Sequence, residues 1–246
     1  MAAAAVVLVP GLAVGSFLNV VAARVPLKRS IVHPGSACMS CATPLAWYDN
    51  VPLLSYARLR GRCRHCGAAI SLRYPAVEAV TALLFAACVL KFGVSWDALV
   101  GGIFCAALVA ISATDLERRI IPNVVVLPAA AVVLAANTIL HPSVEWVAAA
   151  AGAGGFLFLA ALAYPAGMGV GDIKLALLLG AGVGRSVPVA LMAGMIAALV
   201  PAVVLLARHG SAARKMAIPF GPFLALGGVL GLFAGRFLLD QYLGLL

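Results

Sequence analysis

Charged residues are scarce in this chain of 246 residues: they make up 10% of it, against about 25% in a typical soluble domain. Only eight residues are acidic, whereas 64% of the chain is apolar. A soluble fold of this size cannot enclose so much apolar surface, so the composition excludes a water-soluble domain. Stretches long enough to cross a bilayer, about 20 residues, recur along nearly the whole sequence. The sequence therefore predicts a membrane protein.

Hydropathy predicts an all-α fold, a polytopic membrane helical bundle with about eight transmembrane helices. The sixth span is short for a full crossing, so we expect it to be tilted, re-entrant or extended toward Arg185. The first span lacks a basic region before it and a small-residue cleavage site after it, so we interpret it as a retained helix. Its Gly11 and Gly15 favour close helix packing. The spans are expected near residues 3–23, 75–92, 97–115, 121–140, 145–164, 172–184, 187–207 and 218–239.

The distribution of basic residues predicts the orientation of the bundle. With the N-terminus outside, 14 Lys and Arg residues fall in inside segments and three in outside segments, as the positive-inside rule requires. The formal charge of +9 then follows from topology and from attraction to anionic membrane lipids. No nucleic-acid partner is expected.

Residues 24–74, between the first two spans, hold four of the six cysteines in two CxxC pairs, Cys38/Cys41 and Cys63/Cys66, which 21 residues separate. Two such pairs complete a tetrahedral thiolate shell around zinc. We therefore predict a small cytoplasmic zinc-ribbon-like segment, whose closed metal site stabilises the fold and does not catalyse hydrolysis. The alternatives are two disulfides, which a reducing cytoplasm disfavours, and a redox CxxC, which lacks its usual βαβ context.

Two aspartates are expected at the same membrane edge. Asp115 ends the third span, and Asp172 opens the sixth after the glycine-rich Gly167–Gly171, so both arrive at the cytoplasmic face. Acids at that depth are costly and usually functional. Two carboxyls that share a proton can activate water and polarise a peptide carbonyl. The alternative is that each aspartate caps a helix or pairs with Lys174 or Arg118.

Two further polar residues lie in the predicted spans. Glu78 either orients substrate or water, or makes an interhelical hydrogen bond or an ion pair with Arg73. Asn19 is expected to make a hydrogen bond that packs one helix against another.

Along nearly its whole length the chain resembles the type IV prepilin leader peptidases, membrane aspartic proteases of the GxGD kind. Six signatures in the family's order carry the resemblance. They are Gly15–Val21, the tetracysteine region with Asp49–Tyr56 and Leu59–Cys63, Arg73–Pro75 with Glu78, the Asp115 segment with Ile121-Pro122, Gly169–Leu175, and Ile218–Phe223.

The resemblance implies a function. Asp115 and Asp172 match the family's catalytic aspartates, the four paired cysteines match its zinc ligands, and Gly61 matches a glycine associated with methyl transfer. Such enzymes sit in the bacterial cytoplasmic (inner) membrane and serve type IV pili or type II secretion. They cut the basic leader from type IV prepilins and pseudopilins on the cytoplasmic side. Many then methylate the new N-terminus with S-adenosylmethionine.

The expected division of the chain is a first helix (1–23), a tetracysteine segment (24–74) and a membrane-embedded peptidase domain (75–246). Residues Arg24–His33 are fewer than in many bifunctional members, and no Rossmann glycine fingerprint is present. A peptidase without methyl transfer and a non-catalytic zinc-containing membrane assembly factor are therefore alternatives. A transporter would need an internal repeat and deep polar residues, which the sequence does not display.

Overall fold

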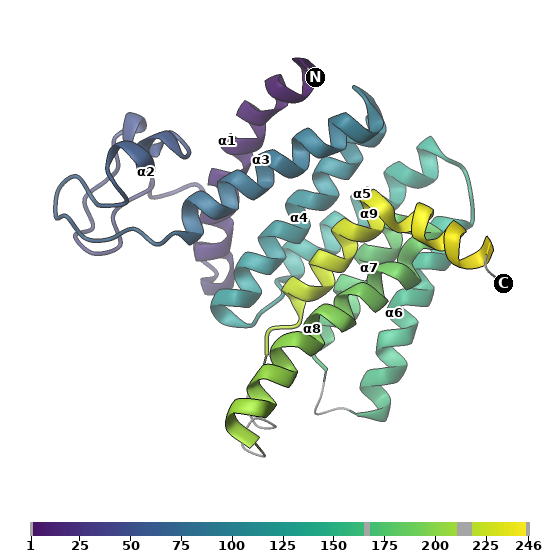
Figure 1. The fold of residues 1–246 in the computed structure, drawn as a ribbon. Coiled ribbons are helices and arrows are strands. Elements are labelled where there is room, and N and C mark those ends of the chain that lie inside the picture. The colour runs from purple at the N-terminus through teal and green to yellow at the C-terminus, as the bar shows by residue number, and fades with distance from the viewer. Residues whose placement is uncertain (1, 165–167, 211–217, 245–246) are drawn as a thin grey trace. The chain divides into compact units, whose positions relative to one another are not determined.

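The computed structural model describes residues 2–164, 168–210 and 218–244. No β-strand forms in this part of the chain, which confirms the all-α fold class. Its eight long helices follow the eight predicted spans closely (Figure 1). They are α1 (Ala2–Arg24), α3 (Arg73–Phe92), α4 (Trp96–Arg118), α5 (Asn123–Leu140), α6 (Glu145–Ala163), α7 (Val170–Val183), α8 (Val187–His209) and α9 (Gly221–Gly244).

Among the described residues, seven candidate membrane spans are long and apolar enough to cross a bilayer. One of them, Val170–His209, has 40 residues and holds both α7 and α8, joined by the 3-10 turn η3 (Gly184–Ser186). The helix α7 itself has 14 residues and is about 21 Å long, shorter than the hydrocarbon layer. The helix begins at Val170, two residues before the predicted start, because Gly169 is its N-cap and Asp172 closes the capping box from the third helical position.

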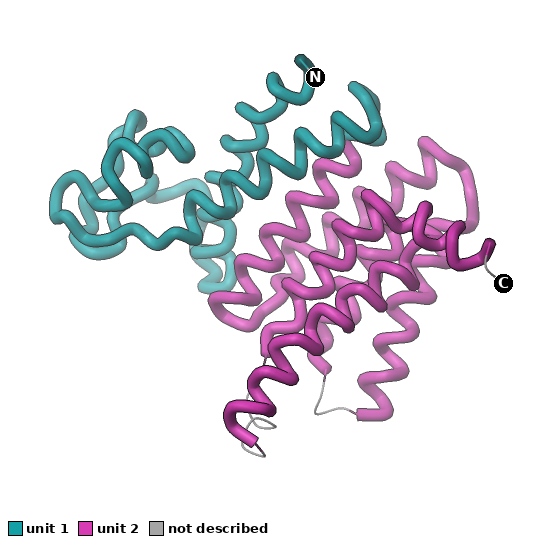
Figure 2. The backbone as a smooth tube through the Cα atoms, viewed as in Figure 1, with its two compact units in different colours: residues 1–98 teal, residues 99–246 magenta. Residues whose placement is uncertain are grey.

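The chain forms two compact units, residues 1–98 and 99–246 (Figure 2). In the first unit, α1 packs along α3. A Cβ on Gly11 would lie 2.7 Å from Cα of Ala82, and one on Gly15 would lie 2.6 Å from Cα of Glu78. The two backbones approach this closely only because both residues are glycine, so the predicted close packing is confirmed. The three-part division of the chain stays a prediction.

The segment between α1 and α3 contains short elements that hydropathy did not predict. They are the 3-10 turns η1 (Val25–Leu27) and η2 (Trp47–Asn50) and the one-turn helix α2 (Leu54–Arg58). Its two isolated β-bridges pair Ala37 with Pro44 and Arg62 with Ala69. Each bridge encloses one CxxC pair.

In the second unit, α7 packs against α5, α6 and α9. Its Leu175, Leu178 and Leu179 are fully buried, and this apolar packing fixes the helix. Gly182 of α7 lies against the ring of Phe104 of α4. This packing of its later turns fixes the direction of α7, whose first turn carries Asp172.

Candidate functional site

Asp115 lies in the last turn of α4 and is buried, with 6% of its surface exposed. Its backbone carbonyl accepts a hydrogen bond of 2.8 Å from the N–H of Arg119. Arg119 has a φ of 54°, the left-handed conformation that commonly ends a helix. The N–H of Gly221, the first residue of α9, donates to Oδ2 of Asp115 at 2.9 Å. A backbone donor from another helix thus fixes the carboxyl.

Asp172 lies in the first turn of α7 and is partly exposed. The N–H of Gly169 donates to its Oδ2 at 3.2 Å, and its own N–H donates to the carbonyl of Gly169 at 3.0 Å. This reciprocal pair closes the start of the helix, where a negative charge is favourable. The capping that the sequence suggested as an alternative is therefore present, and it also orients the carboxyl.

The structure brings the two aspartates to one place in the second unit. Their carboxyl groups interact electrostatically. The chain segments beside them also touch, because a Cβ on Gly171 would lie 2.9 Å from Cβ of Ile121. Lys174 donates a hydrogen bond of 2.8 Å to Oδ1 of Asn123 of α5. Lys174 is thus bound to α5 instead of to Asp172.

The carboxyl oxygens of the two aspartates have the same pattern of hydrogen bonds. In each, Oδ2 accepts one backbone N–H. Neither Oδ1 is hydrogen-bonded to any part of the chain that the structure describes. Oδ1 is thus the oxygen that each group can offer to water or to a peptide. The sequence located both acids, but nothing in it indicated that Gly221 would hold one of them.

The two CxxC pairs fold into matching turns. In the first, the N–H of Cys38 donates to the carbonyl of Thr43 and the N–H of Ala42 donates to the carbonyl of Cys38. In the second, Cys63 bonds with Ala68 and Gly67 in the same way. Ala42 and Gly67 occupy equivalent positions, with φ of 56° and 70°.

The four sulfur atoms form one cluster, all within 4.8 Å of one another. The Sγ atoms of Cys38 and Cys66 lie 3.8 Å apart, too far for a disulfide, and all four cysteines are free thiols. Tetrahedral zinc–sulfur bonds of about 2.3 Å place the sulfur atoms about 3.8 Å apart. The cluster can therefore hold a metal ion, and its geometry suits zinc.

The surroundings of these cysteines favour the thiolate form at three of the four positions. Backbone N–H groups of Cys41 and Ser40 lower the pKa of Cys38, and those of Cys66 and His65 lower the pKa of Cys63. Hydrogen bonds with the side chain and the backbone of Thr43 lower the pKa of Cys41. A bond from Ala68 lowers the pKa of Cys66, but burial and the other three thiols raise it to about 11. A fourth thiolate thus needs a cation among the sulfur atoms.

Two acidic residues of the first unit hold the tetracysteine segment in place. Asp49 makes a contact within the segment, and Glu78 of α3 makes a contact with it. Arg64 donates to both carboxylate oxygens of Asp49, at 2.6 Å to Oδ1 and 2.9 Å to Oδ2, and its hydrogen bonds lower the pKa of Asp49. Glu78 is buried and accepts the N–H of Leu53 at 2.9 Å as well as a hydrogen bond from Ser16. Of the roles expected for Glu78, the structure therefore contains the interhelical hydrogen bond.

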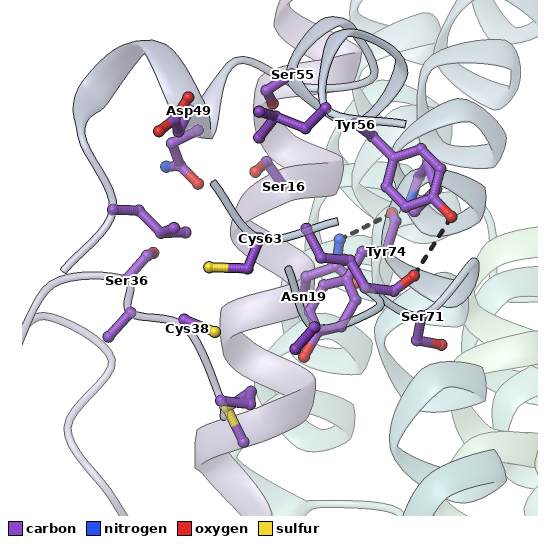
Figure 3. Close-up of a pocket in the computed structure, with 18 of the residues that line it drawn as sticks. Ser16, Asn19, Ser36, Cys38, Asp49, Ser55, Tyr56, Cys63, Ser71 and Tyr74 are labelled. Carbon is purple, nitrogen blue, oxygen red and sulfur yellow. Dashed lines mark hydrogen bonds between the residues drawn. The ribbon is translucent and has the colours of Figure 1, made fainter. Parts of the chain in front are cut away.

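A cavity of about 430 Å³ lies between the tetracysteine segment and the adjoining ends of α1 and α3 (Figure 3). Asn19 lines it and donates 3.0 Å to the carbonyl of Tyr74, the predicted hydrogen bond between α1 and α3. Tyr56, Tyr74 and Glu78 also line it. No sequence pattern indicated this cavity, because its walls come from three separate segments.

Gly61 lies behind the wall of the cavity and does not line it. Its φ is 67°, and a Cβ there would lie 2.7 Å from Oη of Tyr56. Its N–H donates to the carbonyl of Tyr56, and its carbonyl accepts the N–H of Ile70. Oη of Tyr56 in turn donates 3.3 Å to the carbonyl of Ile70. Gly61 therefore holds two wall residues in place.

Two family models match the chain. The one described as the bacterial peptidase A24 N-terminal domain matches residues 9–92, and that of the type IV leader peptidase family matches residues 102–205. The prepilin leader peptidase/N-methyltransferase of Bacillus subtilis (strain 168) is 36% identical over 241 residues, which are 95% of this chain and 95% of the relative. The protein of the same name from Pseudomonas aeruginosa is 34% identical, covering 95% of this chain and 91% of its own.

A third relative with this name, from Burkholderia pseudomallei (strain 1026b), is 36% identical over 93% of this chain and 84% of its own length. No solved structure matches the chain. The first matched range includes the four paired cysteines, and the second includes Asp115 and Asp172. The chain belongs to the type IV leader peptidase family.

Proposed function

We propose that this chain removes the leader peptide from type IV prepilins or pseudopilins, with Asp115 and Asp172 as its catalytic pair. The observation that carries the proposal is that these two carboxyls, from distant parts of the sequence, lie near enough in the second unit to influence each other electrostatically, and that each is oriented by one backbone N–H. Membership of the leader peptidase family supports the reaction, and the apolar helices support a place in the inner membrane.

The environments of the two carboxyls suggest a role for each. Asp172 is partly exposed, so its Oδ1 can take a proton from water, whose oxygen attacks the scissile carbonyl carbon. Asp115 is buried and donates its proton from Oδ1 to the carbonyl oxygen. The tetrahedral intermediate then collapses: one of its hydroxyl protons returns to Oδ1 of Asp115, the C–N bond breaks and the proton on Asp172 leaves with the new amine. The backbone N–H groups on the two Oδ2 atoms keep both carboxyls oriented.

We propose two further properties of this chain, a structural metal site and a second reaction. We assign Cys38, Cys41, Cys63 and Cys66 as ligands of one structural zinc ion, supported by the spacing of their sulfur atoms. We further propose methylation of the new N-terminus with S-adenosylmethionine, supported by the names of the relatives. S-adenosylmethionine would supply the methyl group: it would pass from the sulfonium sulfur to the amine nitrogen, which would lose a proton.

The peptidase proposal is tested with purified protein in lipid nanodiscs and a prepilin substrate. Asp115→Asn and Asp172→Asn should each lower the rate of leader removal by roughly 10²–10⁴-fold, as expected for the loss of an acid–base group. Asp97→Asn removes an acid from the opposite end of α4 and is the matched control. Leader removal at the parental rate by either site variant, folded and loaded with zinc, contradicts the proposed pair.

A further inference from the structure

The outer side of η2 and α2 exposes large apolar side chains, although both elements lie outside the membrane spans. Trp47 of η2 is 82% exposed, and Leu54 of α2 is 71% exposed. On α2, Ser55 and Tyr56 line the cavity (Figure 3), whereas Leu54 and Arg58, one turn apart on the other side, are exposed. Neighbouring apolar side chains left open in this way indicate a surface that a partner covers.

Basic side chains border these apolar residues. The guanidinium of Arg64 lies over the ring of Tyr48, 5.4 Å from its centroid. The rings of Tyr48 and Trp47 meet edge-on, with their centroids 5.6 Å apart. Arg58 and Arg64 both act electrostatically on Asp49, so they lie on one part of the segment. The η2–α2 surface consists of Trp47, Tyr48, Leu54, Arg58 and Arg64.

The η2–α2 surface lies level with the edge of the bilayer. The tetracysteine segment joins α1 and α3, which are both candidate spans. The N–H of Leu53 donates to Glu78, five residues beyond Arg73, the first residue of α3. Five helical residues rise about 7.5 Å, and the headgroup layer on each side of the hydrocarbon is about 5–8 Å thick. Leu54, which follows Leu53, therefore lies among lipid headgroups instead of in bulk water.

The charge of the tetracysteine segment matches an anionic partner. Its residues 24–74 include eight basic residues and one acidic residue, a net charge of +7 out of +9 for the whole chain. The proposed zinc ion with its four thiolates subtracts two from this value, and the segment stays strongly basic. Anionic headgroups attract basic residues near the membrane surface. An acidic soluble protein would match the charge but not the depth of Leu54.

We propose that the η2–α2 surface docks on the anionic phospholipids of the adjoining leaflet. Trp47 and Leu54 enter the boundary between headgroups and acyl chains, where tryptophan is favoured. Arg58 binds the lipid phosphates. Arg64 neutralises Asp49, the acid that the lipid would otherwise repel. The docked surface holds the tetracysteine segment at a fixed height on the membrane, a role separate from the reactions proposed above.

Tryptophan fluorescence of the full zinc-loaded chain in lipid vesicles tests this docking. The chain has three tryptophans, so Trp96→Phe with Trp146→Phe leaves Trp47 as the only reporter. In vesicles of phosphatidylcholine and phosphatidylglycerol, acyl chains brominated near the headgroup should quench Trp47. Acrylamide, which stays in water, should quench Trp47 less than it quenches free N-acetyltryptophanamide. Because Trp146 is buried, the difference between the parent and Trp47→Phe is a second measurement that needs no change at Trp146.

The role of charge is tested with Arg58→Gln. Quenching of Trp47 by brominated lipid is followed as phosphatidylglycerol replaces phosphatidylcholine. Arg58→Gln should weaken docking about fivefold, the usual contribution of one basic residue near an anionic membrane. Lys91→Gln removes the same charge at the opposite end of α3 and should leave the quenching unchanged. Zinc content and thermal unfolding are measured for each variant.

Three results would overturn the inference. In the first, acrylamide quenches Trp47 as strongly as the free amide, and brominated lipid does not quench it. In the second, Trp47 is protected from both quenchers, because a second copy of the chain or another protein covers the surface. In the third, phosphatidylglycerol has no effect, or Arg58→Gln docks as the parent does. None of these measurements depends on leader removal, so failure of the proposed peptidase would leave the docking inference standing.

Discussion

The backbone N–H of Gly221 donates a hydrogen bond of 2.9 Å to Oδ2 of Asp115, joining positions 106 residues apart in the sequence. Gly221 is the first residue of α9, so its N–H has no partner within that helix and is free to bind a carboxyl. The start of α9 therefore fixes Asp115, just as the start of α7 fixes Asp172 through Gly169. Each proposed catalytic acid is oriented by one helix N-terminus.

Gly221→Ala should impair leader removal without unfolding the chain. The new Cβ would lie 2.8 Å from Oδ2 and 3.2 Å from Cγ of Asp115, so the carboxyl must move. A displacement of this kind lowers the rate by roughly ten- to a hundredfold. Cleavage kinetics and thermal unfolding are measured together. Gly155→Ala, which meets nothing within 4 Å, is the control, and equal rates for the two variants would exclude a positioning role for Gly221.

The hydrogen bond between Lys174 and Asn123 should position the first turn of α7. It joins α7 to α5 at 2.8 Å, two residues beyond Asp172. We expect Lys174→Met and Asn123→Leu each to slow leader removal several-fold. The double variant should be no slower than the slower single variant, because both changes remove the same interaction. Multiplicative losses in this double-mutant cycle would mean that the two residues act independently.

Sequence patterns predicted the helices and the cysteine cluster of this molecule better than the contacts between distant segments. Hydropathy located the long helices because each must bury about 20 apolar residues in lipid, and CxxC spacing located the sulfur cluster because it is local. The bonds from Gly221 to Asp115 and from Leu53 to Glu78 are backbone contacts between distant segments, and no residue type specifies them. Asn19 was predicted as a packing residue, and only the structure places its second amide atom beside a cavity.

Metal analysis of the purified chain should find about one zinc per chain, the content of a single four-thiolate site. Cys66→Ser should lower that content, because Cys66 lies 3.8 Å from Cys38 within the cluster. Cys88→Ala is the control, since Cys88 is buried in α3 outside the cluster. Chelation should then make the segment between α1 and α3 sensitive to trypsin, because metal binding supplies folding free energy to so small a unit. Zinc-free protein that resists trypsin equally would contradict this role.

The number of crossings decides on which sides of the membrane the two chain ends lie. If α7 and α8 cross separately, eight crossings place both ends on the same side, and the basic-residue bias places that side outside. If the 40 residues of Val170–His209 cross once, seven crossings place the ends on opposite sides. Because η3 separates α7 from α8, we expect eight. Alkaline phosphatase is active only outside the cytoplasm, so its fusions to either end of the chain should be active. A C-terminus that supports a cytoplasmic fluorescent reporter but no phosphatase activity would refute the separate crossing of α7 and α8.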